Sequence, residues 1–155
     1  MELKTIDLGR GFVAMVDAED YERLSQWKWN AQISRNTVYA VRSVRGSTYY
    51  MHRELFPDSD KVDHEDGNGL NNCRYNLRPC SQSNNMRNTR KHKVGTSKFK
   101  GAHFNKRKQV WQSYICIPKR THLGYYSTEV EAALAYNFAA AHHFGEFARL
   151  NEVHV

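Results

Sequence analysis

A long stretch with charge of one sign constrains this chain more than any other feature. Between Asp66 and Glu129 the sequence contains thirteen Lys or Arg residues and no acidic residue. Residues 61–108 carry twelve basic against three acidic side chains, whereas the flanking parts are close to neutral, so the net charge of +7 arises in the middle. Such a segment cannot neutralise itself and must face solvent or an anionic partner. A polyanion, most simply DNA or RNA, is therefore the favoured partner.

The length and hydropathy of the chain limit the domains that it can build. With 155 residues, 40% of them apolar, it can hold one ordinary domain or two small ones with modest cores. It has no run of about 18 apolar residues, which a membrane-spanning helix needs. Its first residues, MELKTIDLGRGF, lack the basic start and apolar middle of a signal peptide. We therefore expect a cytoplasmic protein without membrane association.

The three cysteines, Cys73, Cys80 and Cys116, occur without a CxxC pair. An odd number without that spacing argues against a disulfide framework and against a tetrahedral zinc site. We expect them to be small buried apolar residues. The alternative is a metal half-site formed by Cys73 and Cys80 and completed by histidines.

Residues 1–50 are expected to form a small β-rich region around one helix. The stretch GFVAMV has a strand pattern, and Asp17 can cap a helix over residues 18–26 because acidic residues fill its first turn. Aromatic and β-branched residues then predict strands in WKWNAQ, TVYAVRSV and STYYMHREL, separated by the turn signals SRN and RGS. Nothing in this region has catalytic spacing, so we expect a structural or positioning role.

The middle of the chain, residues 57–89, is poor in apolar residues. Two brief strands are expected at KVDH and NLRP, on either side of a glycine-containing loop. Ser81 offers an N-cap for a helix over residues 82–92, so that strand, loop, strand and helix follow one another closely. The basic stretch KHKVGTSKFKG, residues 91–101, is expected to be a linker that also touches phosphates.

Residues 93–155 show the most regular pattern. Three strands are expected first, with turns at NKRKQ and PKRTH. Thr128 and Glu131 form a capping box that opens an Ala-rich helix, and Gly145 ends it. We therefore expect a three-stranded antiparallel sheet packed on one helix. The helix residues expected in the core are Ala133, Leu134, Tyr136 and Phe138.

The stretch VDHEDGNGLNNCRYNL places Asp63 and His64 beside several asparagines. Neighbouring side chains on a strand point to opposite faces, so this pair alone establishes little. If the two strands fold back on each other and the helix packs across them, Asp63 and His64 can converge with Asn85. The alternative is that the Asn, Asp and Gly residues indicate turns only. Three asparagines that we expect to be turn residues are Asn68, Asn71 and Asn72.

Chemically, such a set suits the hydrolysis of a phosphodiester bond. Asp63 and the amide oxygen of Asn85 are hard ligands for Mg²⁺ or a similar ion. His64, neutral near pH 7, can take a proton from the attacking water. Asn76 can hydrogen-bond to the backbone across the loop and hold His64 in position.

The segment MHRELF…KVDHEDGNGLNNCRYNLRPCSQSNNMRN, Met51 to Asn88, resembles the HNH endonucleases of the homing type found in phages. The family motif reads hydrophobic-Asp-His-x-Asp-Gly-Asn, then Asn-Leu-Arg, then Asn-x-x-Asn. The resemblance implies a ββα-metal nuclease over residues 51–92 that binds one divalent ion. It also implies that the protein works in the cytoplasm of a bacterial or phage-infected host cell.

The same resemblance implies a role for each matching residue. Asp63 and Asn85 would bind the metal ion, His64 would be the general base, and Asn76 would brace the loop as part of the catalytic set. Asn84 competes with Asn85 as the second ligand. Because asparagine stands where other members have a final histidine, Mg²⁺ or Mn²⁺ is favoured over zinc. The arginines expected to contact phosphates in this region are Arg53, Arg78 and Arg87, and His52 is either a packed strand histidine or a functional one.

Residues 96–151 resemble the APETALA2-type DNA-binding domain of plant transcription factors and phage homing endonucleases. FKGAHFNKRKQVWQSYI parallels its first two strands, and HLGYYSTEVEAALAYNFAAAHHFGEFARLN parallels its Leu-Gly-x-Phe, its Ala-rich helix and its closing Leu-Asn. The resemblance implies a sheet in the major groove, so alternate strand residues should face DNA. Trp111 and Tyr114 belong either to that face or to the core. The residues expected to contact DNA are Lys98, Lys100, His103, Asn105, Arg107, Lys108, Gln112, Lys119 and Arg120.

Taken together, the sequence predicts an α+β protein with an N-terminal β-rich region, a ββα-metal HNH centre and a C-terminal DNA-reading sheet. We expect a site-directed DNA endonuclease, a homing or phage nicking enzyme, that hydrolyses phosphodiester bonds with one divalent ion. Its expected partner is double-stranded DNA. No protein partner is implied, and one centre per chain suggests a monomer that nicks one strand, although a dimer could cut both. The alternatives are a DNA-binding regulator with a vestigial nuclease centre and an RNA-binding protein.

Overall fold

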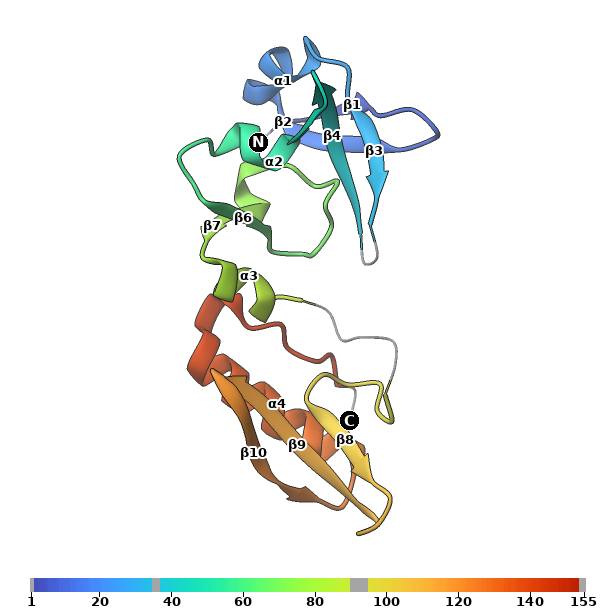
Figure 1. Ribbon diagram of the computed structural model, residues 1–155, viewed down its shortest axis with the longest axis vertical. Coiled ribbons are helices and arrows are strands. Elements are labelled where there is room, and N and C mark those ends of the chain that lie inside the picture. The colour runs from blue at the N-terminus through green and yellow to red at the C-terminus, as the bar shows by residue number, and fades with distance from the viewer. Residues whose placement is uncertain (1, 35–36, 90–94, 154–155) are drawn as a thin grey trace. The chain divides into compact units, whose positions relative to one another are not determined.

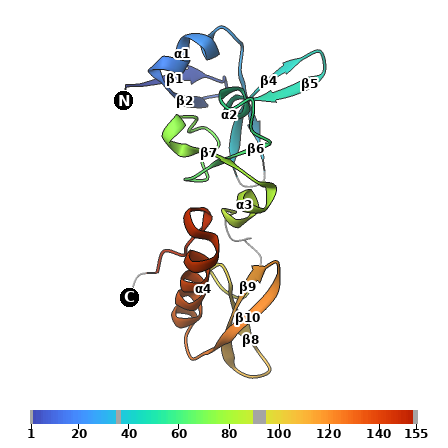
Figure 2. The ribbon, with the colours of Figure 1, turned by 90° about the vertical axis from the view of Figure 1, so that its left-hand side faces the viewer.

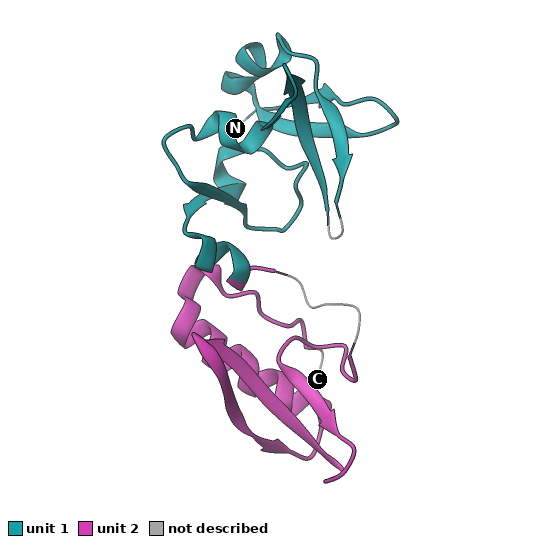
Figure 3. Ribbon diagram, viewed as in Figure 1, with its two compact units in different colours: residues 1–86 teal, residues 87–155 magenta. Residues whose placement is uncertain are grey.

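The structure is a computed structural model that describes residues 2–34, 37–89 and 95–153 (Figure 1). It is mixed α+β, as predicted, with small antiparallel sheets and short helices. The chain divides into two compact units, Met1–Met86 (unit 1) and Arg87–Val155 (unit 2), which Figure 3 shows in different colours. Within the described residues, no helix is long and apolar enough to cross a membrane.

One hydrophobic core joins the first two regions that the sequence predicted, 1–50 and the part of 51–92 that belongs to unit 1. Small modules bury too little apolar surface to be stable alone. The strands and helices that precede residue 50 and those that follow it therefore share their core. Its buried residues are Ile6, Leu8, Ala14, Val16, Leu24, Trp29, Ala40, Met51, Leu55, Val62 and Leu77.

The N-terminal strands β1 (Leu3–Asp7) and β2 (Val13–Asp17) form an antiparallel pair that leads into helix α1 (Ala18–Ser25). Strand β1 was not predicted, because its residues are mostly polar and only Ile6 is buried. Asp17 holds the N-cap position, but its side chain does not cap the helix. Its Oδ2 instead accepts a hydrogen bond from the backbone N of Arg74 at 2.7 Å, so the predicted capping role is wrong.

A three-stranded antiparallel sheet follows, with β4 (Val38–Val44) between β3 (Asn30–Ile33) and β5 (Ser47–Tyr50). Arg45 and Gly46, with φ of 49° and 83°, join β4 to β5. Positive φ at both positions is the backbone of a tight two-residue hairpin turn.

The predicted strand STYYMHREL is only half correct, because its second part is helix α2 (Met51–Leu55). Met51, His52 and Leu55 are all buried. That spacing lies on one face of a helix but on both faces of a strand. His52 is therefore a helix residue, not the strand residue that the sequence suggested.

Strands β6 (Lys61–His64) and β7 (Leu77–Cys80) pair antiparallel, and the short 3-10 helix η1 (Arg74–Asn76) lies in the connection between them. Helix α3 (Gln82–Arg87) follows, as predicted, and Ser81 Oγ accepts a hydrogen bond from the backbone N of Asn84 at 3.2 Å. The helix is shorter than the predicted 82–92, of which residues 90–92 lie outside the described residues. Figures 1 and 2 show the order β6, β7, α3.

Unit 2 is a three-stranded antiparallel sheet in the order β10-β9-β8 with helix α4 (Glu129–Phe144) packed on it (Figure 2). The strands are β8 (Ala102–Asn105), β9 (Val110–Ile117) and β10 (Lys119–Tyr126). This arrangement agrees with the sequence, except that Lys119 and Arg120 lie in β10 and not in a turn.

The ends of α4 follow the predicted signals. The side chain of Thr128 accepts a hydrogen bond from the backbone N of Glu131 at 3.1 Å, and Glu131 Oε2 accepts one from the backbone N of Thr128 at 3.2 Å. This is the predicted capping box. At the other end Gly145, with φ of 52°, ends the helix and begins the 3-10 helix η2 (Gly145–Phe147).

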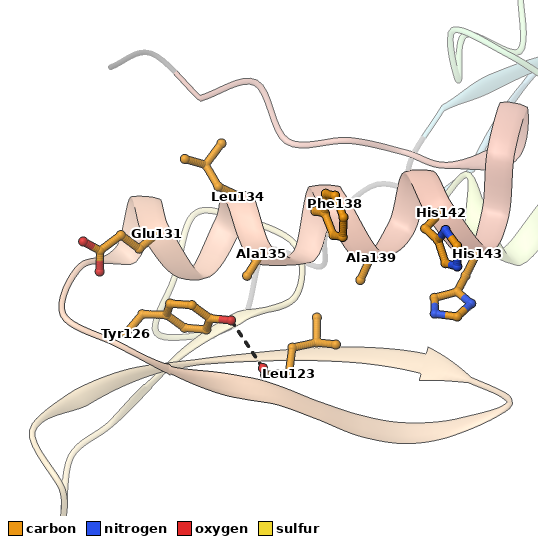
Figure 4. Close-up of a pocket in the computed structure, with 9 residues that line it drawn as sticks. All are labelled: Leu123, Tyr126, Glu131, Leu134, Ala135, Phe138, Ala139, His142 and His143. Carbon is orange, nitrogen blue, oxygen red and sulfur yellow. Dashed lines mark hydrogen bonds between the residues drawn. The ribbon is translucent and has the colours of Figure 1, made fainter.

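The core prediction for α4 is right for Ala133 and Tyr136 and wrong for Leu134 and Phe138. Leu134 is 45% exposed and Phe138 is 81% exposed. Both lie outside the face that meets the sheet, where small alanines allow close approach. They line an open apolar pocket together with residues of β10 such as Leu123 (Figure 4).

The three cysteines have different surroundings. Cys73 is buried, and burial raises the pKa of its thiol to about 11, so it is unreactive. Cys80 is only half-buried and Cys116 is exposed, so the expectation of a buried apolar residue is wrong for Cys116. Within the described ranges, Cys73 and Cys80 belong to no group of three potential metal ligands, which gives the half-site no support.

Candidate active site and nucleic-acid interface

The β6–β7 hairpin presents Asp63 and His64 to opposite faces. Asp63 pairs across the ladder with Arg78, and His64 pairs with Leu77. Both side chains are nevertheless buried, with 6% of Asp63 and 5% of His64 exposed. The alternation of the strand therefore gives each of the two residues its own set of partners.

Asp63 is held by an ion pair. Its Oδ2 accepts a hydrogen bond from Nη2 of Arg78 at 2.8 Å, and both side chains are nearly buried. A buried carboxylate needs such a partner because an isolated charge is very unfavourable away from water. Arg78, predicted to contact phosphate, is thus bound in this structure to the predicted metal ligand.

His64 lies in a shell of side chains from three different segments. Its Nε2 is 3.5 Å from Oδ1 of Asn72, and its ring centroid is 4.8 Å from that of His52 and 5.9 Å from that of Tyr39. Burial lowers the pKa of His64, although Asn72 and two nearby carboxylates oppose that shift. The imidazole is therefore neutral near pH 7, the form that can accept a proton.

Asn76 ties together the loop that follows His64. Its Oδ1 accepts a hydrogen bond from the backbone N of Asp66 at 3.0 Å. Its Nδ2 donates to Oδ1 of Asp66 at 3.0 Å and to the backbone O of Asn71 at 2.8 Å. Asn76 is 3% exposed, and its bond to Asn71 is buried, whereas the two bonds to the exposed Asp66 are partly buried. They are the cross-loop contacts that a bracing residue requires.

Two of the three asparagines expected to be simple turn residues are buried. Asn72 is 1% exposed and contacts His64, and Asn71 is 5% exposed and donates from Nδ2 to Oδ2 of Asp66 at 2.9 Å. Asn68 alone is exposed, with Oδ1 accepting a hydrogen bond from the backbone N of Leu70 at 3.1 Å. The sequence signal for Asn72, a second asparagine in a loop, does not distinguish it from a turn residue.

The second predicted metal ligand lies on α3. The backbone N of Asn85 donates to the backbone O of Ser81 at 3.0 Å, within the first turn of the helix. The side chains of Asn84 and Asn85 are both half-buried. Burial therefore does not separate them, and Asn85 remains the predicted ligand with Asn84 as its competitor.

The donors Asp63 and Asn85 suit a hard divalent ion by their chemistry. A carboxylate and an amide oxygen are ligands that Mg²⁺ accepts, and too few to satisfy it without water and substrate oxygens. The buried carboxylate of Asp63 already needs a cation beside it, and Arg78 supplies one here. An ion at Asp63 would therefore share or replace the contact with Arg78.

A second acidic group is better explained by arginine than by metal. The ligand atoms of Asp17, Glu19 and Asp20 lie within 4.8 Å of one another. However, Arg74 donates from Nε to Oδ2 of Asp20 at 2.7 Å and from Nη2 to Oδ1 at 2.8 Å. Together with the bond from the Arg74 backbone to Asp17, these contacts hold the segment that contains η1 against α1.

The open face of the unit 2 sheet carries a continuous row of rings and cations. The guanidinium of Arg120 lies 4.0 Å from the ring centroid of Tyr114, which is 5.0 Å from the ring of His122. The ring of His122 is 4.7 Å from that of Tyr125, whose hydroxyl accepts a hydrogen bond from Nζ of Lys108 at 2.8 Å. We call these five residues the aromatic row.

The opposite face of the sheet packs on α4 through residues that include Trp111 and Ile115. Alternation along β9 then places Gln112 and Tyr114 on the open face. Trp111 is therefore a core residue, and Tyr114 is the aromatic that faces outward. His122 and Tyr125 were missed by the sequence, because only the register of β9 with β10 brings them beside Tyr114.

Three residues predicted to contact DNA are buried or hydrogen-bonded within the protein. Lys100 precedes β8, and its Nζ donates to the backbone O of Arg87 at 2.6 Å and of Thr89 at 2.8 Å. Asn105 Oδ1 accepts hydrogen bonds from two backbone N atoms in the turn after β8. Gln112 is 6% exposed. These side chains are thus engaged within the protein, and their contact with DNA stays a prediction.

The other predicted contacts are accessible, with two exceptions. Arg78 is nearly buried in its ion pair with Asp63. Arg87 is half-buried, and its guanidinium lies 4.8 Å from the ring centroid of Phe144. The exposed ones are Arg53, Lys98, His103, Arg107, Lys108, Lys119 and Arg120.

No protein-family model matches the chain, and no curated protein or solved structure is significantly similar to it.

Proposed function

We propose that the protein is a DNA endonuclease of the HNH type, in which unit 1 cuts the strand and unit 2 holds the duplex. The observation that carries the proposal is the buried His64 at the end of β6, in a hairpin that α3 follows and that Asn76 braces. Buried titratable groups with altered pKa values cost stability and gather at functional sites. A functional role therefore explains the burial of His64 better than a contribution to stability does.

The chemistry follows from the surroundings of each side chain. Burial keeps the His64 imidazole neutral, so that it can take a proton from the water that attacks the phosphorus. Asp63 and Asn85 would hold one Mg²⁺ or Mn²⁺ ion, which would stabilise charge on the phosphate and on the leaving sugar oxygen. Asn76 would keep the loop after His64 in one conformation, so that the base stays near that water.

Unit 2 would supply most of the affinity for DNA. The exposed cations at the turn after β8 and at the start of β10 suit phosphates, and the aromatic row suits contact with sugars and bases. Binding through several cations should weaken steeply as salt rises. This part of the proposal rests on the single-signed charge and on the open face of the sheet.

A nicking assay tests the proposal. Supercoiled plasmid and phage DNA are incubated with the purified protein in Mg²⁺, in Mn²⁺ and in EDTA. The expected result is ion-dependent conversion to open circles, which the Asp63→Asn variant does not catalyse. Absence of cleavage on every DNA substrate would overturn the nuclease proposal, and tighter binding of structured RNA than of duplex DNA would overturn the choice of partner.

One observation favours a second candidate, a DNA-binding protein that does not cut. The carboxylate that should bind the ion is already bonded to Arg78 at 2.8 Å. In such a protein that ion pair would be permanent. Titration with Mn²⁺ distinguishes the two, because a permanent pair predicts no Mn²⁺ binding that depends on Asp63.

A further inference from the structure

His52 occupies a site where packing alone does not call for histidine. It is 5% exposed on α2, with the rings of Tyr39 and Tyr50 at centroid distances of 5.7 and 5.5 Å. Its buried Nδ1 has no hydrogen-bond partner among the described residues. An apolar side chain would fill such a site without placing there a polar nitrogen that lacks a protein partner, which destabilises the folded state.

The neighbour of His52 offers a reason for this choice. The centroids of the His52 and His64 rings are 4.8 Å apart, and the ring planes meet at 75°. Edge-to-face contact of this kind favours one relative orientation of two rings. His64 also meets Tyr39 of β4 and Asn72 of the loop, so His52 completes a shell drawn from distant segments.

His52 itself carries no charge under ordinary conditions. Burial lowers its pKa to about 3, helped by the nearby His64 and Arg53. A neutral ring can lie against His64 without repelling it. The contact therefore acts through shape and orientation.

We propose that His52 is a positioning residue that fixes the ring orientation of His64. The inference rests on the proposed function, in which His64 is the general base. It also assigns β4 and α2 a role beyond stability, because they place Tyr39 and His52 beside that base. A rotated His64 would point its nitrogen away from the attacking water, and misplacement by about 1 Å can slow a reaction roughly a hundredfold.

Two variants test the inference in the full-length protein. His52→Leu introduces an apolar side chain of similar size and removes the ring and its nitrogens, and His52→Gln keeps a polar end. For His52→Leu we expect a free energy of unfolding equal to or above that of the wild type, because no polar nitrogen is buried. We also expect kcat for nicking to fall roughly a hundredfold, with KM for DNA unchanged. His52→Gln should recover part of kcat.

The imidazole ¹⁵N signals of His64 provide a readout that does not depend on cleavage. They should shift in His52→Leu, since the tautomer and hydrogen bonding of His64 change with its orientation. Wild-type kcat or unshifted signals in His52→Leu would overturn the inference, as would an activity loss matched by unfolding. If the wild type itself does not cut, the proposed function fails first, which distinguishes the two failures.

Discussion

Replacing Asn76 with alanine removes the side chain that ties the loop between β6 and β7. Three hydrogen bonds are lost, from Nδ2 to Asp66 and to Asn71 and from the Asp66 backbone to Oδ1. A net contribution of about 1 kcal/mol for each bond gives a loss of about 3 kcal/mol in the free energy of unfolding. This is an upper value, because Asp66 is exposed and water can replace part of two of the three bonds.

Urea unfolding at neutral pH measures this loss, with Asn68→Ala as the matched control. Asn68 belongs to the same loop but is exposed, and its side chain accepts a hydrogen bond from the backbone N of Leu70, so its replacement should cost less than about 1 kcal/mol. Asn76→Asp adds a second test, because it would place a carboxylate oxygen where Nδ2 now lies, 3.0 Å from Asp66 Oδ1. If the free energy of unfolding of Asn76→Ala lies within about 1 kcal/mol of the wild-type value, the bracing role is refuted.

Three further predictions concern charge. Burial would raise the pKa of Asp20, but its hydrogen bonds to two arginines bring that pKa below the ordinary 3.8. The stability that this ion pair contributes is therefore present above pH 3.8 and is lost as the pH falls through the pKa of the folded state. Asp20→Asn should therefore lower the free energy of unfolding at pH 7 and have little effect at acid pH. Equal losses at the two pH values, measured by urea unfolding, would show that the ion pair does not stabilise the protein. Burial lowers the pKa of Lys100 to about 8 from 10.5; between these values the unfolded chain binds more protons, so stability should rise with pH there, and Lys100→Met should abolish that rise. If the stability of Lys100→Met rises with pH as steeply as that of the wild type, Lys100 is not the source of the rise. In DNA-binding titrations, Arg120→Gln should reduce the slope of log affinity against log salt by about one, whereas Tyr114→Ala should weaken binding by about 1–3 kcal/mol without changing that slope; unchanged affinity in both would place DNA elsewhere.

Unit 2 was the easier half to predict, because its signals are local. The capping box at Thr128 and the glycine at 145 specify both ends of α4 within a few residues. The pattern of β9, by contrast, left open whether Trp111 or Tyr114 faces the core, and only the packing against α4 places Trp111 there. What could not be predicted is which flank of α4 stays open, since Leu134 and Phe138 have the same apolar character as the residues that face the sheet.

Unit 1 depends on contacts between distant segments, which explains the errors there. Asp17 looks like a helix cap but bonds to Arg74, fifty-seven residues away. Met51–Leu55 has the aromatic and apolar neighbours of a strand, yet burial of three residues on one side makes it a helix. Local propensity is a weak guide where tertiary packing decides.

The candidate site shows the same division. The positions of Asp63, His64 and Asn76 follow from a motif that lies within one hairpin. The shell around His64 does not, because Tyr39 and His52 reach it from β4 and α2. Their role depends on a fold that the pattern of the hairpin alone does not specify.

In the proposed function His64 takes the proton from the attacking water. The most direct test is the single-turnover rate of nicking by His64→Ala on supercoiled DNA in Mg²⁺, with DNA affinity measured alongside. Loss of a general base should slow cleavage by a factor of about 10²–10⁴, with affinity for DNA unchanged. Cleavage by His64→Ala within a few-fold of the wild-type rate would exclude His64 as the general base.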